Sequence, residues 1–213
     1  MSIRLGDIAP DFTADTTQGV LSFHDWKEGA WAVLFSHPAD FTPVCTTELG
    51  RTAALSGEFA ARNAKPIAVS VDSVEDHRRW APDIAEVAGV EVDFPIIADE
   101  DREVSQAYDM IHPGEGDTST VRSVFLIDPS NTVRLTITYP KSVGRNFVEI
   151  LRALDALQAT DRAPISTPAE WVPGDRVIVA PTSSPEAAPA RLASAPAVTP
   201  HLRLAPAPAP PAP

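Results

Sequence analysis

AVLFSHPADFTPVCTTELGR, residues 32–51, joins a short apolar run to a segment that carries the only cysteine of the 213-residue chain. The run at 32–36 predicts a buried strand, because its apolar residues are continuous rather than alternating. Thr42 followed by Pro43 is a helix-start signal, since threonine is a favoured N-cap and proline fits the first helical position. The stretch therefore predicts a strand-to-helix junction, with Cys45 in the first turn of a helix that runs to about residue 62.

Strand-like and helix-like segments alternate through the rest of the first 160 residues. Apolar runs and periodicities predict further strands at 67–71, 94–98, 121–127 and 132–139, and helices at 75–87 (interrupted near Pro82), 102–108 and 146–158. The proline and polar residues at 128–131 predict a hairpin turn. Early β-α-β units, a later hairpin and a closing helix predict an α/β sandwich with a mixed sheet.

Two segments follow the predicted domain, which spans residues 1–160. Residues 161–180 contain Trp171 and the run DRVIV at 175–179, which predicts an extra strand in a small module or in an arm that packs on a partner subunit. Residues 181–213 hold 10 of the 22 prolines, so we expect an extended, disordered tail.

Composition excludes several classes of function. The formal net charge of −12 opposes binding to phosphate backbones and to anionic lipid, so neither nucleic acid nor a membrane is an expected partner. The first residues do not resemble a signal peptide, and no run of eighteen apolar residues occurs, so we expect a cytoplasmic protein. A single cysteine can form neither an internal disulfide nor a thiolate-rich zinc site, and we expect no metal or cofactor.

Cys45 allows two interpretations. It could be a small core residue, because free cysteine is among the most buried residue types. It could also be a reactive thiol, because free N–H groups and the helix dipole favour a thiolate in the first turn. Thr42 stands where a C-x-x-C oxidoreductase has its other cysteine, so a thiolate here would react with an oxidant to give a sulfenic acid.

Arg122 is the second residue with two interpretations. Alternation along 121–127 places it on the same face as Val124 and Leu126. It could sit at the end of the strand with its head in solvent. It could also be a guanidinium that holds a thiolate ionised and positions a peroxide oxygen.

The residues around Cys45 resemble a known family. Pro38, Thr42 and Cys45 match the P-x-x-x-T-x-x-C signature of peroxiredoxins, and HPADFTPVCTTELGR (37–51) resembles their one-cysteine subfamily. The resemblance continues through SVDSVEDH (70–77), FPIIAD (94–99), VRSVFLIDP (121–129), TYPKSVGRNFVEILR (138–152) and TPAEWVPGDRVIV (167–179). It implies a thioredoxin-like fold with a C-terminal extension.

The resemblance also implies a thiol-dependent peroxidase that reduces hydrogen peroxide and organic hydroperoxides. Carried onto this chain, Cys45 is the peroxidatic cysteine, Thr42 and Arg122 orient the peroxide and hold the thiolate, and Pro38 shields the pocket. Three supporting residues are implied: His37 near the sulfur, Glu48 orienting an arginine, and Arg145 as a second arginine. The sulfenic acid would be resolved by an external thiol, in a homodimer or a larger ring. The alternative is a peroxide-sensing or chaperone-like protein that uses the same cysteine.

One departure from the family is informative. Some relatives also carry a phospholipase activity built on a G-x-S-x-G serine with a histidine and an aspartate. Here Ala30 occupies the position of the serine and Ser130 that of the acid, and only His24 remains. A serine-based mechanism lacks its nucleophile, so we expect no phospholipase activity.

Overall fold

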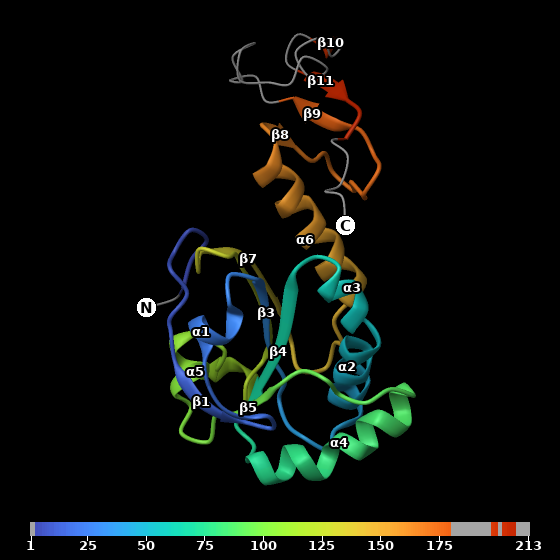
Figure 1. Ribbon diagram of the computed structural model, residues 1–213. Coiled ribbons are helices and arrows are strands. Elements are labelled where there is room, and N and C mark those ends of the chain that lie inside the picture. The colour runs from blue at the N-terminus through green and yellow to red at the C-terminus, as the bar shows by residue number, and fades with distance from the viewer. Residues whose placement is uncertain (1–2, 180–196, 200–201, 208–213) are drawn as a thin grey trace. The chain divides into compact units, whose positions relative to one another are not determined.

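The computed structural model describes residues 3–179, 197–199 and 202–207 (Figure 1). The chain forms two compact units, Met1–Phe147 and Val148–Pro213. In the part of the chain that the structure describes, none of the helices combines the length and the apolar composition that a membrane crossing requires.

The first unit is built on a seven-stranded mixed sheet of order β2-β1-β5-β4-β3-β6-β7. Its strands are β1 (Thr13–Thr16), β2 (Gly19–Ser22), β3 (Trp31–Ser36), β4 (Ala64–Ser70), β5 (Ile96–Ala98), β6 (Arg122–Ile127) and β7 (Val133–Tyr139). The central strands β3, β4 and β5 are parallel, whereas β6 and β7 form an antiparallel hairpin beside β3. The α/β sandwich with a mixed sheet is confirmed.

Helices cover both faces of this sheet. They are α1 (Phe23–Lys27), α2 (Pro43–Ala54), α3 (Ser56–Ala60), α4 (Val74–Ala88) and α5 (Glu103–Ala107), with the 3₁₀ turn η1 (Pro113–Glu115). In Figure 1, α1 and α5 lie on one side of the sheet, and α2 and α4 lie on the other. Ala32 and Leu34 of β3 join the core on the α1 side with Phe23 and Val104. The side chains of Val33 and Phe35 point to the opposite face, as strand geometry requires.

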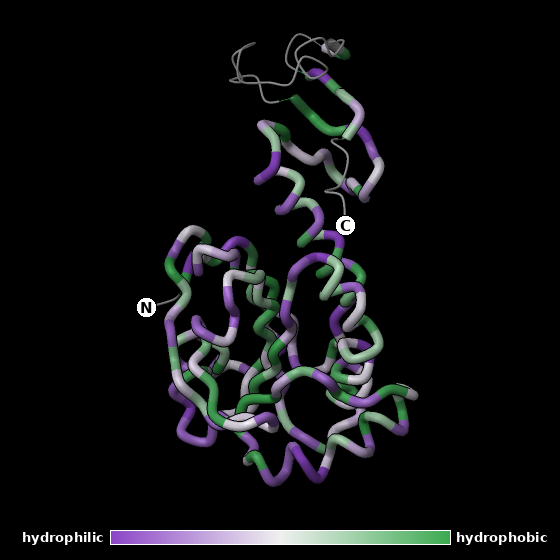
Figure 2. Tube along the Cα trace, in the orientation of Figure 1, coloured by the Kyte–Doolittle hydropathy of each residue, from purple (hydrophilic) through white to green (hydrophobic). Residues whose placement is uncertain are grey.

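Buried apolar side chains dominate the central strands, which explains why the sheet is covered on both faces. All six residues of β3 and all six of β6 are buried. Figure 2 shows the same pattern, with hydrophobic stretches along the middle strands and hydrophilic residues toward the outer helices. Continuous apolar runs are what parallel strands buried on two faces require.

Several local features differ from the sequence-based expectations. The N-terminal hairpin β1–β2 and α1 were not predicted, because these elements are short and partly exposed. The helix expected over 43–62 is two helices, α2 and α3, which break at Leu55. Pro82 does not interrupt α4, which is continuous over 15 residues. A proline inside a helix removes one backbone hydrogen bond, and the buried Trp80 and Ile84 retain the helix through packing.

The second unit begins within α6 (Phe147–Arg162) and carries a four-stranded sheet of order β10-β11-β9-β8. Its strands are β8 (Ile165–Ser166), β9 (Val177–Val179), β10 (Ala197–Thr199) and β11 (Leu202–Ala205). Trp171 packs with Ala159 of α6 and with Val177 in a small core. The backbone carbonyl of Trp171 also accepts a hydrogen bond from Arg152. These contacts group most of α6 with the small sheet, so the division falls at residue 147 rather than at the expected 160.

The expected disorder of 181–213 does not hold for the described part of that segment. Strand β11 pairs with β9 through Leu204 opposite Ile178 and Ala205 opposite Val177. Ala205 is fully buried in the same core as Trp171. The prediction of disorder rested on local composition, which contains no information about pairing between strands that are distant in the sequence. Residues 180–196, 200–201 and 208–213 lie outside the described residues.

Candidate active site

The junction predicted at residues 32–51 is present at the carboxyl end of β3. Helix α2 begins at Pro43, and Cys45 lies in its first turn with a fully buried side chain. Thr42 is the N-cap residue, but its hydroxyl does not cap the helix as expected; Oγ1 donates to the carbonyl of Ala39 at 2.8 Å. The hydroxyl hydrogen of Thr42 therefore points toward the 37–42 loop. The hydroxyl oxygen is therefore left as an acceptor.

Arg122 is the first residue of β6, and its guanidinium is buried rather than solvated. Strand β6 runs antiparallel to β3, so the start of β6 lies beside the end of β3, where Cys45 follows. Nη1 of Arg122 lies 3.3 Å from Sγ of Cys45 and 2.7 Å from Oε2 of Glu48. Nε and Nη2 both donate to the carbonyl of Lys141, at 2.8 and 2.6 Å. The guanidinium is thus held in one orientation against the sulfur.

Glu48 lies one turn beyond Cys45 on α2 and joins two arginines. Besides the contact with Arg122, its carboxylate accepts three hydrogen bonds from Arg145, from the backbone N, Nε and Nη2, at 2.7, 2.9 and 2.7 Å. Burial raises the pKa of Glu48, but the hydrogen bonds and charge of Arg145, together with the charge of Arg122, hold it below its ordinary value. The carboxylate is therefore ionised, and each of its two oxygens accepts two hydrogen bonds from the arginines.

Arg145 is also fixed on its remaining sides. Nη1 donates to the carbonyl of Ser123 at 2.9 Å, and the guanidinium lies over the rings of Phe35 and Phe147. Aromatic faces attract a cation, and here they also exclude water. Cys45, Glu48, Arg122 and Arg145 thus form one connected and buried group.

The loop at 37–42 carries the other residues implied by the resemblance. Pro38 is buried in it. Backbone contacts tie the loop to neighbouring strands: the N–H of His37 donates to Val69, and the His37 carbonyl accepts from Thr120 Oγ1. Among the described hydrogen bonds, the sulfur of Cys45 is reached by Arg122, whereas His37 and Thr42 bond elsewhere.

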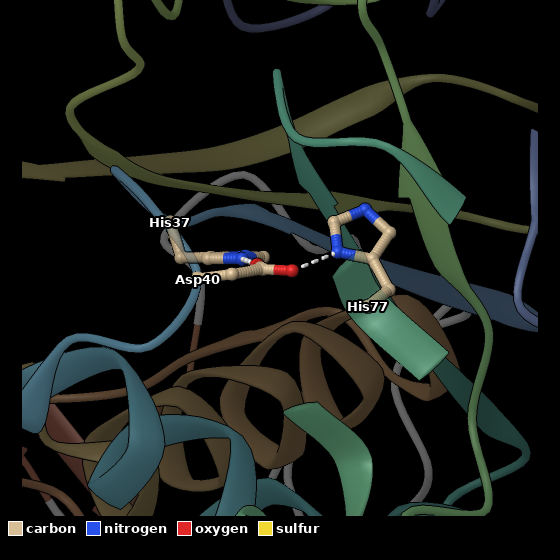
Figure 3. A group of neighbouring side chains, drawn as sticks. All are labelled: His37, Asp40 and His77. Atoms are coloured by element: carbon tan, nitrogen blue, oxygen red, sulfur yellow. Dashed lines mark hydrogen bonds and ion pairs between the residues drawn. The ribbon is translucent and has the colours of Figure 1, made fainter. Parts of the chain in front are cut away.

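His37, Asp40 and His77 form a second buried cluster (Figure 3). Nε2 of His37 lies 2.8 Å from Oδ1 of Asp40, and Nδ1 of His77 lies 2.6 Å from Oδ2. Burial lowers the pKa of His37, although Asp40 opposes this. Burial raises the pKa of Asp40, but the hydrogen bonds of the two histidines outweigh it and hold that pKa below its ordinary value.

The same three side chains are the grouping within the described residues that offers histidine and carboxylate atoms within 4.8 Å of one another. Such a set could in principle surround a metal ion. In this structure the atoms that would face an ion are already joined to one another by hydrogen bonds. We therefore describe the group as a hydrogen-bonded cluster, and refer to it as the His37–Asp40–His77 cluster.

Sequence reasoning did not identify Asp40, His77 or the Lys141 carbonyl. Asp40 lies inside the segment 37–51 and His77 ends the segment 70–77, but the family resemblance implied no role for either residue. The two are 37 positions apart, and no local periodicity relates them. The Lys141 carbonyl is a backbone hydrogen-bond acceptor, and because every residue has one, the residue type cannot predict this role.

Comparison with known proteins agrees with the fold. Residues 5–136 match the model of the AhpC/TSA family, and residues 156–195 match the C-terminal domain of 1-Cys peroxiredoxin. A 1-Cys peroxiredoxin of Dictyostelium discoideum is 48% identical over 207 residues, covering 97% of this chain and 86% of that protein.

Two solved structures are similar over almost the whole chain. A cysteine-to-serine mutant of peroxiredoxin 6 from Arenicola marina superposes with a TM-score of 0.90 at 45% identity, covering 97% of this chain and 99% of that one. A yeast mitochondrial 1-Cys peroxiredoxin, described with its thiol resolving mechanism via glutathione/thioredoxin systems, has a TM-score of 0.90 at 47% identity, with coverages of 96% and 100%. The chain therefore belongs to the peroxiredoxin family, in its one-cysteine branch, and is a thiol-dependent peroxidase with a single cysteine.

Proposed function

We propose that Cys45 is the residue that attacks the hydroperoxide and that Arg122 and Thr42 orient the substrate. The observation that carries this proposal is the contact of Arg122 Nη1 with both Sγ of Cys45 and the carboxylate of Glu48. Arginine is almost never buried unless it is paired. Here the guanidinium is paired on one side and faces a sulfur atom on the other.

The charges of the buried group support a thiolate. Arg122 and Arg145 contribute two positive charges and Glu48 one negative charge, so the group carries one uncompensated positive charge without the cysteine. An unpaired buried charge is costly, and a Cys45 thiolate would neutralise it. The helix N-terminus adds to the same effect.

The chemistry follows from this arrangement. The Cys45 thiolate attacks one oxygen of R–O–O–H, forming an S–O bond as the O–O bond breaks. The sulfur is oxidised to a sulfenic acid, and the other oxygen leaves as an alcohol or water after taking a proton. Donors on Arg122 stabilise negative charge on the peroxide oxygens, most strongly in the transition state. The Thr42 oxygen, whose hydrogen is bonded to Ala39, accepts a hydrogen bond from the peroxide O–H.

Four further residues support this centre in the proposal. Glu48 and Arg145 hold Arg122 in position through the contacts described above. Pro38 lies buried in the 37–42 loop and shields the pocket from water. His37 belongs to the same loop, next to the sulfur according to the family resemblance.

The second half of the reaction requires a thiol from outside the chain. A thiol RSH condenses with the sulfenic acid to give a mixed disulfide and water, and a second thiol releases Cys45 and R–S–S–R. The yeast relative has a thiol resolving mechanism via glutathione/thioredoxin systems. This similarity supports an external thiol as the reductant here as well. Hydrogen peroxide and organic hydroperoxides are the proposed substrates.

The oligomeric state and the cellular location of the protein are predictions. We propose a homodimer or a larger ring, with residues 161–180 as an intersubunit arm. Sedimentation velocity of the wild-type protein and of a variant without residues 161–180 measures the oligomeric state and tests this proposal. We also propose a cytoplasmic location. One relative is mitochondrial, so fractionation of cells that express the tagged chain is the deciding measurement.

Peroxide consumption with a small thiol reductant tests the central proposal. We expect many turnovers per Cys45, and mass spectrometry of samples quenched during turnover should show the sulfenic acid at this residue. C45S should consume no peroxide. Full activity in C45S would contradict the proposal, and a single turnover without recycling would favour the peroxide-sensing alternative.

A further inference from the structure

The hydrogen bonds of the His37–Asp40–His77 cluster determine how many protons the cluster holds. Nε2 of His77 lies 3.1 Å from the carbonyl oxygen of Ile97, and a carbonyl can only accept, so this nitrogen carries a hydrogen. Nδ1 of His77 lies 2.6 Å from Oδ2 of Asp40, and Nε2 of His37 lies 2.8 Å from Oδ1. Each of these two hydrogen bonds needs one proton. The cluster therefore holds three protons on its three hydrogen bonds.

The fourth ring nitrogen, Nδ1 of His37, is buried and has no hydrogen-bond partner among the described residues. A proton on it would create an orphaned buried N–H donor, which is rarer in proteins than an unpaired acceptor. It would also give the cluster a net positive charge in a buried site. Three protons without it make the cluster neutral, whether the proton shared by Asp40 and His77 sits on the carboxylate or on the imidazole.

The surroundings of His37 add one further charge. Asp72, two residues after the end of β4, accepts hydrogen bonds from the backbone N–H of Asp40 and from Ser70 Oγ. The ring of Trp80 from α4 lies 5.5 Å from the ring of His37. The titratable groups that face His37 are therefore Asp40 from the loop, His77 from α4, and Asp72 from the segment between β4 and α4.

We propose that Asp40 and His77 are positioning residues that hold His37 as its Nε2–H tautomer with an unprotonated Nδ1. Asp40 accepts the His37 hydrogen, and His77 supplies the proton that neutralises Asp40. Without the His77 proton, the buried carboxylate would be compensated by protonation of His37 itself. The proposal rests on the proposed function only in so far as His37 faces the peroxide site, where an unprotonated nitrogen can accept a proton.

Three substitutions separate this role from simple packing. In D40N the amide oxygen accepts from His37 and the amide N–H donates to Nδ1 of His77, so all three hydrogen bonds persist and the cluster stays neutral. In H77N the amide N–H still donates to Asp40, but the neutralising proton is gone and His37 should become doubly protonated. D40L removes both bonds and leaves the His37 tautomer unconstrained.

Nitrogen-15 NMR of the reduced full-length protein, labelled at histidine, measures the outcome directly. The chain has five histidines, and the His37 signals are assigned by their loss in H37Q. We expect one protonated and one bare nitrogen for His37 in wild type and in D40N, and two protonated nitrogens in H77N at pH about 7. A proton on Nδ1 in wild type, or an unchanged His37 in a folded H77N, would overturn the inference.

Peroxidase assays give a second readout. We expect kcat/KM of H77N to be lower by about 10-fold at neutral pH and to recover as pH rises, because deprotonation restores the bare nitrogen. D40N should follow the wild-type pH profile, whereas D40L should not. Identical pH profiles in wild type and a folded H77N would contradict the inference. If H77N does not fold, the wild-type spectrum and the D40N and D40L pair decide. Failure of the proposed function would appear separately, as full activity in C45S.

Discussion

Nη1 of Arg122 lies 3.3 Å from Sγ of Cys45, although the two residues are 77 positions apart in the chain. The contact exists because β6 runs antiparallel to β3, which brings the first residue of β6 to the end of β3. Glu48 accepts a second hydrogen bond from Nη1, and the Lys141 carbonyl accepts from Nε and Nη2. The cation that faces the sulfur is thus held by groups from two other parts of the chain, helix α2 and the segment that follows β7.

Replacement of Arg122 tests this contact. Lysine keeps the charge but cannot reach the sulfur, Glu48 and the Lys141 carbonyl together, because it lacks the planar fork of donors. We expect R122K to lower kcat/KM for hydrogen peroxide by about 100-fold, the cost typical of removing one preorganised donor, and R122M to lower it further. Arg51, exposed on α2, provides the matched control, and R51K should retain the wild-type rate. A rate for R122K equal to that of R51K would refute the role of the guanidinium.

Acid stability should depend on Glu48. Its folded-state pKa lies below the ordinary value of 4.5, so its contribution to stability is present above that value. The contribution is lost as pH falls through the folded-state pKa. We expect E48Q to reduce the free energy of unfolding by about 3–5 kcal/mol at neutral pH, because it leaves a buried guanidinium charge uncompensated.

The difference between E48Q and wild type should shrink as the pH is lowered below 4.5, because the wild-type carboxylate then becomes protonated. Urea unfolding at a series of pH values measures this difference. Glu86, exposed on α4, offers the control substitution E86Q. A constant gap between wild type and E48Q across the acid range would show that the charge of Glu48 is not what stabilises the fold.

Two glycines should respond in opposite directions to alanine. A Cβ on Gly50 of α2 would lie 2.9 Å from Cβ of Ala88 on α4, so one of the two helices must shift. We expect G50A to destabilise the protein by about 1–3 kcal/mol. Gly57 in α3 has open space around its Cβ position, and G57A should stabilise by about 0.5–1 kcal/mol. Thermal unfolding of both variants checks the prediction, which is wrong if they shift in the same direction.

Phospholipase activity should be absent. Ala30 is buried where a nucleophilic serine would be needed, Ser130 is exposed, and Nε2 of His24 lies 3.0 Å from the carbonyl of Ala9. Among the hydrogen bonds of the described residues, none joins the His24 ring to a hydroxyl group that could serve as the nucleophile. We expect no release of fatty acid from phospholipid vesicles by a preparation that is fully active with peroxide. Lipid hydrolysis that survives C45S but is lost on substitution of Ala30 would contradict this.

The local elements of the fold were predictable because their signals are local. The apolar run at 32–36, followed by Thr42 and Pro43, predicted the β3–α2 junction and the place of Cys45. Alternation along β6 placed Arg122 on the same face as Val124 and Leu126, but it left open whether the guanidinium is solvated or buried. In contrast, β1, β2 and α1 are short and partly exposed, so their periodicity was too weak to recognise.

The amino-acid sequence alone was enough to identify the chemically reactive residues: one cysteine at a helix start, an arginine on an apolar face, and a family signature around them. Their contacts with one another depend on the folded chain. The antiparallel pairing of β6 with β3 brings Arg122 to Cys45, and helix α4 carries His77 to Asp40. Residue periodicity reports burial within a segment and carries no information on which distant segment supplies the partner. That choice is made by the packing and hydrogen bonding of the whole chain.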